Sequence, residues 1–346
     1  MTTEMNAARA PERDVRAEMV ELLQGAWRAR AVHVAAELGI PDLLVDGPRT
    51  VADLAARTKT HAPTLGRLLR TLTSFGVFER LADGNTYAQS ALSAVLCTNP
   101  GCAEATDALF QAAPWHWAAW GELLFTVQTG TASFDRANGS GFWELTRTNP
   151  DAQRRFNSAM SSVSEEESDA IAHAYDFSGV RELVDVAGGK GSLLRAVLRA
   201  NPDIRGKLLD RPSVLSLAAD LLSGQGVDDR YELVPGDFFQ SVPPGADVYL
   251  IKRALHDWEA DDIVRILVTI RRAMRPDSRL LVIESTLEDD AKQEWLFRDL
   301  LLLVLCGGQE RAEREYRELM SRAGLRVTRS IPIGDGPLRV IEAVRE

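Results

Sequence analysis

Hydrophobic positions in the first half of the chain recur at the spacing of amphipathic helices. Residues 50–56 and 62–74 read as two such helices, and residues 77–87 read as a short hairpin around an Asp-Gly-Asn turn. Before them, residues 15–38 predict a long helix with one apolar stripe, formed by Met19, Leu22, Leu23, Ala26, Trp27 and Val34. Helix, helix and hairpin in this order are typical of a winged-helix unit.

The pattern changes near residue 180, where short apolar runs begin to alternate with helical segments. Alternation of this kind predicts an α/β fold with a Rossmann-like, mostly parallel sheet and helices on both of its faces. Ligands of such sheets bind beyond the carboxyl ends of the strands. The runs that predict strands are 183–186, 207–209, 231–234, 247–251 and 280–284, with 325–331 and 338–344 as a closing pair.

These patterns predict three parts. Residues 1–100 are expected to form an N-terminal, all-α winged-helix-like domain, residues 101–178 a helical linker, and residues 179–346 the sheet domain. A winged helix can bind DNA, but its second helix offers only Arg67 and Arg70 to a groove. The other interpretation is a dimerisation and lid module.

Charge and cysteine content narrow the classes of partner. The 346 residues carry a formal net charge of -10, which argues against nucleic acid or an anionic membrane as the main partner and favours a small ligand. Three cysteines without metal-ligand spacing make a disulfide framework or a zinc site unexpected. The longest apolar run, 300–305, is too short to span a bilayer, and the polar N-terminus lacks the apolar core of a signal peptide. We therefore expect a cytoplasmic protein.

A nucleotide-binding turn is predicted after the first strand. Residues 183–191 run from a hydrophobic strand into a glycine-rich turn, and a helix opens at Ser192. Asp210 closes the next strand, where a carboxylate can accept two hydrogen bonds from a ribose diol. On this observation alone, a nicotinamide dehydrogenase and other nucleotide-binding enzymes are both possible.

Four motifs in order carry a family resemblance. They are Asp-Val-Ala-Gly-Gly-Lys-Gly at 185–191, Gly-Asp-Phe-Phe at 236–239, Leu-His-Asp-Trp at 255–258 and Gly-Gly-Gln-Glu-Arg at 307–311. With them the chain resembles the S-adenosylmethionine-dependent class I O-methyltransferases, which include plant caffeate and flavonoid enzymes and bacterial enzymes that tailor antibiotics. The resemblance covers nearly the whole chain. It implies methyl transfer to a phenolic or enolic hydroxyl of a small polycyclic secondary metabolite, and a homodimer formed through the front helices.

The resemblance also implies where S-adenosyl-L-methionine binds. Four of the implied contacts have a structural alternative of their own: Asp210 can cap a helix, Asp237 can be a turn residue, Lys252 can be solvated and Arg155 can lie on the surface. In addition, Ala187 stands where relatives have a third glycine, so we expect a negative φ at this residue. The implied cofactor contacts are Arg155, Asp185, Gly189, Asp210, Asp237, Phe238 and Lys252.

His256 is the predicted catalytic base. Its unperturbed pKa of ~6.5 would leave it neutral at physiological pH, so that it can accept the proton of an acceptor hydroxyl. By resemblance, Glu284 and Glu310 flank and orient this histidine. Asp257 invites a metal interpretation, in which carboxylates hold magnesium against a catechol. We expect no metal, because the carboxylates suit orientation of a base better than a converging set of oxygen ligands.

The substrate pocket is inferred from aromatic residues in the helical part before the sheet, about half of which we assign to packing. The expected substrate contacts are Trp115, Asn157, Met160 and Asp257, although Asp257 can instead begin the helix 259–274. Two alternatives to methyl transfer remain besides a dehydrogenase. One is a winged-helix regulator, and the other is a relative that binds the same cofactor but catalyses hydroxylation or decarboxylation.

Overall fold

The computed structural model describes residues 14–98, 102–288 and 291–346, and the chain divides into two compact units, Met1–Ala112 and Ala113–Glu346. The helices of residues 113–178 cluster with the sheet. The three-part division at residues 100 and 178 stays a prediction.

The first unit is mostly helical and carries one small antiparallel sheet in the order β1-β3-β2. It contains α1 (Val15–Glu37), α2 (Ile40–Leu43), β1 (Arg49–Thr50), α3 (Val51–Thr58), α4 (Ala62–Thr73), β2 (Phe78–Arg80), β3 (Thr86–Gln89), α5 (Ala91–Ala94) and α6 (Ala103–Ala112). Both predicted helices and the hairpin are therefore confirmed. Leu65, Leu69 and Leu72 recur at helical spacing on α4 and are buried in the core of this unit.

The apolar stripe of α1 is largely exposed in the single chain. Leu22 and Leu23 are each 69% exposed, and Trp27 is 73% exposed. A continuous apolar surface of this kind marks an interaction site more often than an ordinary surface.

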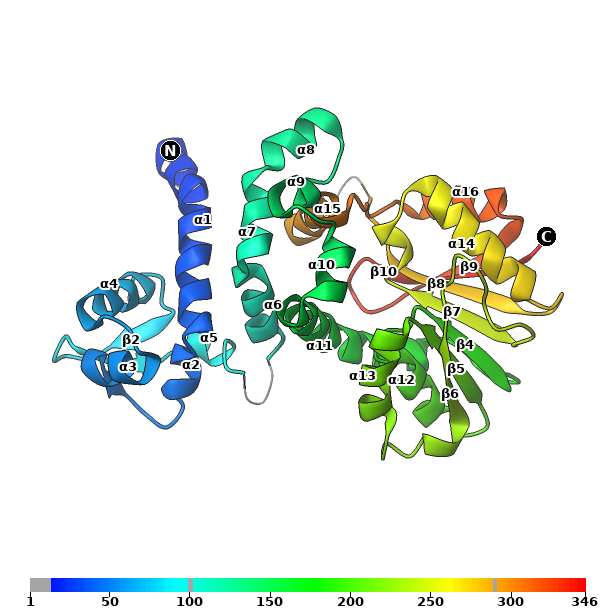
Figure 1. Ribbon diagram of the computed structural model, residues 1–346, viewed down its shortest axis with the longest axis horizontal. Coiled ribbons are helices and arrows are strands. Elements are labelled where there is room, and N and C mark those ends of the chain that lie inside the picture. The colour runs from blue at the N-terminus through cyan, green and yellow to red at the C-terminus, as the bar shows by residue number, and fades with distance from the viewer. Residues whose placement is uncertain (1–13, 99–101, 289–290) are drawn as a thin grey trace, which may run out of the picture. The chain divides into compact units, whose positions relative to one another are not determined.

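The second unit begins with five helices and continues with the alternating strands and helices (Figure 1). The five helices are α7 (Pro114–Gly121), α8 (Leu123–Thr129), α9 (Phe134–Asn138), α10 (Phe142–Thr148) and α11 (Pro150–Ala174). The elements that follow are β4 (Glu182–Val186), α12 (Ser192–Ala200), β5 (Arg205–Asp210), α13 (Pro212–Leu222), η1 (Asp228–Arg230), β6 (Tyr231–Pro235), β7 (Val248–Lys252), η2 (Leu255–Asp257), α14 (Ala260–Ala273), β8 (Arg279–Ser285), α15 (Gln293–Cys306), α16 (Glu313–Arg322), β9 (Leu325–Pro332) and β10 (Leu338–Arg345).

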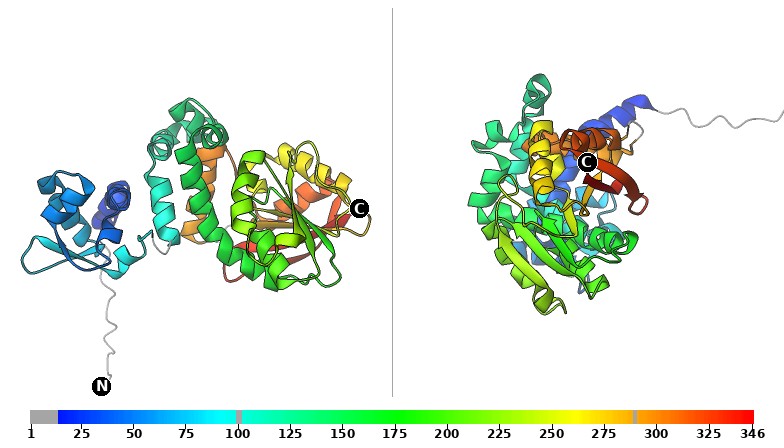
Figure 2. Two further views of the ribbon diagram at one scale, coloured as in Figure 1. Left: turned by 60° about the horizontal axis from the view of Figure 1, so that its bottom comes forward. Right: turned by 90° about the vertical axis from the view of Figure 1, so that its right-hand side faces the viewer.

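These strands form a seven-stranded sheet in the order β6-β5-β4-β7-β8-β10-β9. The strands from β6 to β8 pair in parallel, and β10 runs antiparallel to both β8 and β9. Figure 2 shows from two further directions that helices cover both faces of the sheet. The predicted α/β fold with its closing strand pair is confirmed.

Two apolar layers hold the helices on the sheet. One face packs against residues of α11, α12 and α13, and the other packs against residues of α14 and α16. The five parallel strands consequently direct their carboxyl ends, and the loops that follow them, to the same edge. Among the described helices, none combines the length and the apolar character that crossing a bilayer requires.

Candidate active site

The glycine turn after β4 is built around two buried or half-buried carboxylates. Asp185 lies in β4 with no exposed surface, and neither of its side-chain oxygens has a hydrogen-bond partner among the described residues. Burial raises the pKa of Asp185 to about 7, although the charge of Lys252 opposes this shift. Such a carboxylate fits a positively charged ligand group, because a buried unpaired acceptor is costly.

The glycines of this turn let its backbone pack closely on its neighbours. A Cβ atom at Gly188 would lie 2.3 Å from Leu208 and 2.5 Å from Asp185, so only glycine fits there. Gly189 adopts φ +61° and donates its N–H to Asp210 Oδ2 at 2.9 Å. Asp210 ends β5 and its Oδ1 accepts from Arg211 N at 2.7 Å. Asp210 therefore positions the turn, as well as standing where a ribose diol is expected.

Ala187 adopts φ +56°, so the expectation of a negative φ is wrong. Its methyl group is accommodated in the left-handed region, where a Cβ atom costs about 1–2 kcal/mol. The Ala187 N–H donates to Leu209 O at 2.8 Å, and this bond holds the residue in place between β4 and β5.

Asp237 and Phe238 follow β6 at the same edge. Asp237 is exposed and its Oδ1 accepts from Phe239 N at 2.9 Å, which makes it a turn residue whatever else it binds. The ring of Phe238 is half-buried and stands edge-on to Trp258, with the ring centroids 6.1 Å apart. This contact with Trp258 fixes the orientation of the Phe238 ring.

Two of the predicted cofactor contacts have ionic partners. Lys252 Nζ lies 3.2 Å from Glu167 Oε2, and its side chain is only 7% exposed, so the interpretation as a solvated lysine is wrong. Arg155 Nε lies 2.9 Å from Asp151 Oδ2, one turn earlier on α11. To bind a ligand carboxylate, Arg155 would have to share its guanidinium with Asp151.

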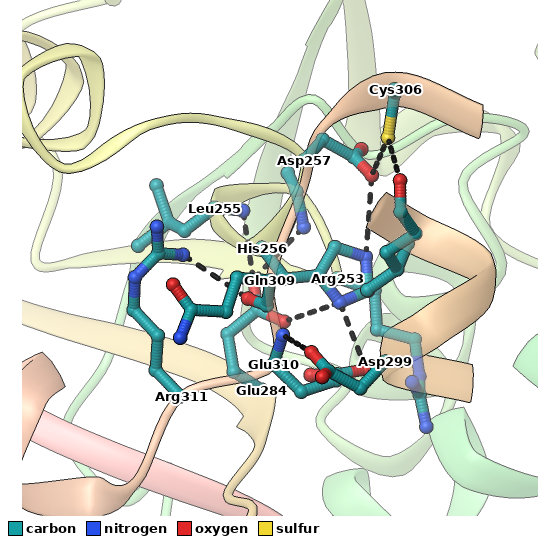
Figure 3. Close-up of polar contacts among 12 residues, drawn as sticks. Arg253, Leu255, His256, Asp257, Glu284, Asp299, Cys306, Gln309, Glu310 and Arg311 are labelled. Atoms are coloured by element: carbon teal, nitrogen blue, oxygen red, sulfur yellow. Dashed lines mark hydrogen bonds and ion pairs between the residues drawn. The ribbon is translucent and has the colours of Figure 1, made fainter. Parts of the chain in front are cut away.

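His256 lies on η2, directly after β7, with three carboxylates around its ring (Figure 3). Its Nδ1 is 3.2 Å from Glu310 Oε1 and 3.5 Å from Glu284 Oε2, whereas Nε2 is 3.6 Å from Asp257 Oδ1. Glu284 is held in turn because its Oε1 accepts from Ala254 N and Leu255 N at 3.0 and 2.8 Å. Two carboxylates require a proton on Nδ1, so in the neutral ring Nε2 is the nitrogen that can accept one.

This environment changes the protonation of the histidine. Burial alone would lower the pKa of His256, but the charges of Glu284 and Asp257 and the bond to Glu310 outweigh it and raise the pKa to about 10. The expectation that His256 is neutral at physiological pH is therefore wrong for this arrangement. For the Asp257 carboxyl, by contrast, burial itself raises the pKa, to about 7. Asp257 lies next to the thiol of Cys306, with Sγ 3.8 Å from Oδ1.

The catalytic group is supported by Asp299, which no motif indicated, and by Arg311, the last residue of the motif at 307–311. Asp299 on α15 accepts from Glu310 N at 2.8 Å, and the Arg311 guanidinium donates to Trp258 O at 2.9 Å. The Gln309 N–H donates to His256 O at 2.8 Å, so the segment after α15 packs directly on the histidine backbone. The contact of Asp299 with Glu310 joins positions 11 residues apart, and that of Arg311 with Trp258 joins positions 53 residues apart, so no local pattern points to them.

Some aromatic residues of the helical part are packing residues. Phe134 is fully buried and Phe142 is 4% exposed, and both lie 6.1 Å from Trp115, measured between ring centroids. Asn157 and Met160 lie on α11, where Met160 is 45% exposed. Trp115, Asn157 and Met160 stay predicted substrate contacts.

A metal could be held by His256, Glu284 and Glu310, whose ligand atoms lie within 4.8 Å of one another. One oxygen of each glutamate is already used, because Nδ1 bonds Glu310 Oε1 and Glu284 Oε1 accepts two backbone N–H groups. Glu284 Oε2 and Glu310 Oε2 have no hydrogen-bond partner among the described residues. That no metal takes part stays a prediction.

Two protein-family models match this chain, one in each of its two units. Residues 120–326 match the O-methyltransferase domain, and residues 20–99 match the O-methyltransferase dimerisation domain. The chain belongs to the O-methyltransferase family. The methyltransferase is similar to the mitomycin biosynthesis 6-O-methyltransferase of Streptomyces lavendulae, with 56% identity over 94% of this chain and 93% of that protein.

Solved structures agree with this assignment. The mitomycin 7-O-methyltransferase matches with a TM-score of 0.94 and 55% identity over 96% of this chain and 98% of that chain. An O-methyltransferase from neocarzinostatin biosynthesis, solved with S-adenosyl-L-homocysteine and 1,4-dihydroxy-2-naphthoic acid, matches with a TM-score of 0.82 and 31% identity over 92% and 96%. The sequence of residues 110–120 and 236–258 indicates a likeness to this mitomycin 7-O-methyltransferase within the family, and the structural match confirms the likeness. The cofactor of this methyltransferase is S-adenosylmethionine.

Proposed function

We propose that this methyltransferase methylates a phenolic or enolic hydroxyl of a small polycyclic secondary metabolite in antibiotic biosynthesis. The observation that carries the proposal is the His256 ring, whose Nδ1 lies between two buried carboxylates. Its Nε2 lies 3.6 Å from Asp257 Oδ1 and is the nitrogen that accepts a proton once the ring is neutral. The names of the similar proteins support an aromatic acceptor, because they describe mitomycin and naphthoic acid chemistry. A His-carboxylate group favours methyl transfer over hydroxylation or decarboxylation.

In the proposed mechanism, His256 removes the acceptor proton. When bound, S-adenosylmethionine supplies a methyl group on a sulfonium, which is already a good leaving group. The protein therefore has to align the acceptor and take its proton, which moves to Nε2 as the oxygen bonds to the methyl carbon. Glu284 and Glu310 stabilise the imidazolium, and Asp257 lies beside Nε2, where it would contact acceptor oxygen atoms.

The proposed contacts with the cofactor and the acceptor follow from the chemical groups of the side chains and from their places in the site. Asp185 would accept from the methionyl ammonium and Asp210 from the ribose hydroxyls, since the first is buried without a partner and the second ends its strand beside Gly189. Asp237 and Phe238 would contact adenine, and Lys252 and Arg155 would lie along the methionyl part. Trp115, Asn157 and Met160 would contact the acceptor ring.

We also propose that the methyltransferase works as a homodimer in the cytoplasm. The exposed apolar stripe of α1 and the match of residues 20–99 to a dimerisation domain support self-association. All three cysteines are free thiols, which suits a reducing compartment.

The proposed activity is tested with S-adenosylmethionine labelled on its methyl group and a panel of hydroxyquinones, anthracyclines and simple phenols. We expect labelled O-methyl products from polycyclic hydroxyquinones and little or none from simple phenols. If label appeared only on nitrogen, or an acceptor were hydroxylated or decarboxylated without gaining a methyl group, the proposal would be wrong.

A further inference from the structure

A buried charge cluster outside the catalytic group joins α11 to the strand end that precedes His256. Glu167 on α11 accepts two bonds from the Arg253 guanidinium, from Nε at 3.0 Å and from Nη2 at 2.6 Å. Lys252 Nζ lies 3.2 Å from the same carboxylate. The side chains of Glu167, Arg253 and Lys252 are 18%, 17% and 7% exposed. A bidentate contact of this kind fixes the orientation of both groups, not only their separation.

Arg253 occupies a backbone position that needs support. Its φ of 47° lies in the left-handed region, which side chains other than glycine rarely adopt. Its N–H donates to Ile283 O at 3.0 Å, and the next two N–H groups, of Ala254 and Leu255, donate to Glu284. The turn at Arg253 therefore orients the Glu284 carboxylate and begins the η2 helix that carries His256.

The Arg253 guanidinium also lies within electrostatic reach of the catalytic carboxylates. Burial lowers the pKa of Arg253, but the bond to Glu167 and the charges of Glu310 and Glu284 raise it above its ordinary value. Glu167 thus neutralises the Arg253 guanidinium, which lies between α11 and the carboxylates of the catalytic group. Without the Glu167 charge, the repulsion between Lys252 and Arg253 across the turn would be uncompensated.

We propose that Glu167 is a positioning residue for methyl transfer, which acts through Arg253 to hold the His256 turn in register with α11. This inference rests on the proposed role of His256 as the base. Because α11 also carries the predicted contacts Asn157 and Met160, the same carboxylate would keep the acceptor helix and the base in one fixed geometry. A displacement of about 1 Å at a reacting group can cost on the order of 100-fold in rate.

The chain offers a matched control on the same helix. Glu165 pairs with Arg195 of α12, with Arg195 Nη2 3.0 Å from Glu165 Oε1. Glu165→Gln removes an ion pair between α11 and the sheet domain without touching the turn at Arg253. If Glu167 only helped to dock α11, the two substitutions would have similar effects.

The test compares Glu167→Gln, Glu167→Asp and Glu165→Gln, with the best methylated hydroxyquinone of the panel as acceptor and S-adenosylhomocysteine as binding probe. We expect Glu167→Gln to lower kcat by about 10- to 100-fold, with the Kd for S-adenosylhomocysteine changed by less than about threefold. Glu167→Asp should recover part of the lost kcat, because it restores the charge. Glu165→Gln should keep wild-type kcat.

An acceptor-free measurement gives a second readout. In protein labelled with 15N-histidine and bound to S-adenosylhomocysteine, the His256 ring resonances should shift in Glu167→Gln and stay unchanged in Glu165→Gln. Equal kcat in Glu167→Gln and wild type, or equal losses in both glutamine variants, would overturn the inference. If His256→Ala itself kept full turnover, the proposed function would fail first, so the two failures are distinguishable.

Discussion

At the scale of single residues, the ionic environment of His256 determines how the base works. Glu284 and Glu310 face Nδ1 and Asp257 faces Nε2, so the protonated ring is stabilised and its pKa rises to about 10. A group with a raised pKa holds its proton across the neutral range and loses it only as the pH approaches that pKa. The proposed base must be neutral before it accepts a proton, so turnover should increase with pH above 7.

Glu310→Gln tests this electrostatic account. Removal of one negative charge destabilises the imidazolium, so the pKa of His256 falls and the acidic limb of the pH–kcat profile moves to lower pH, by roughly one unit. The maximum kcat should fall as well, since the imidazolium that forms during the reaction is less stabilised. Glu232→Gln, an exposed glutamate paired with Lys207, is the control. An unshifted limb in Glu310→Gln would contradict the account.

At the scale of elements, the carboxyl ends of the parallel strands assemble the site. Asp185, Asp210 and Lys252 stand at the ends of β4, β5 and β7, and Glu284 stands near the end of β8. Their positions follow from the alternating pattern and the parallel pairing, so the sequence was sufficient to predict them. The glycine turn packs its backbone closely on Leu208 and Asp185 at Gly188 and faces open space at Gly189.

Asp210→Ala tests the role of the β5 end. The substitution removes the acceptor of the Gly189 N–H and the expected ribose contact, and hydrogen bonds to charged groups contribute about 1.5–3 kcal/mol. We expect the Kd for S-adenosylmethionine to rise about 10- to 100-fold in isothermal titration calorimetry. Asp203→Ala, at an exposed aspartate before β5, serves as the control. Unchanged affinity in Asp210→Ala would exclude Asp210 from the cofactor site.

Other features at this scale could not be predicted from the sequence. The helix α11 continues to Ala174 and so places Glu167 beside Arg253. Contacts such as Glu167 with Arg253 and Asp299 with Glu310 depend on tertiary packing and have no spacing signature. The left-handed conformation of Ala187 and the raised pKa of His256 likewise arise only from the folded environment.

At the scale of the whole molecule, the apolar face of α1 is exposed in the single chain and would be buried in a dimer. We expect Trp27→Glu to place a charge in the proposed interface and to convert dimers into monomers in sedimentation equilibrium. Glu21→Lys changes the charge on the opposite side of the same helix and should leave the dimer intact. A wild-type protein that sediments as a monomer would contradict the proposed homodimer.

The central claim is that His256 removes the acceptor proton, and His256→Ala tests it most directly. The decisive measurement is single-turnover methyl transfer from labelled S-adenosylmethionine, made together with calorimetric binding of S-adenosylhomocysteine. Loss of a general base lowers turnover by about 10²- to 10⁴-fold, and we predict that the Kd stays within about threefold of wild type. Turnover at the wild-type rate in His256→Ala, or a loss explained entirely by weaker cofactor binding, would contradict the account.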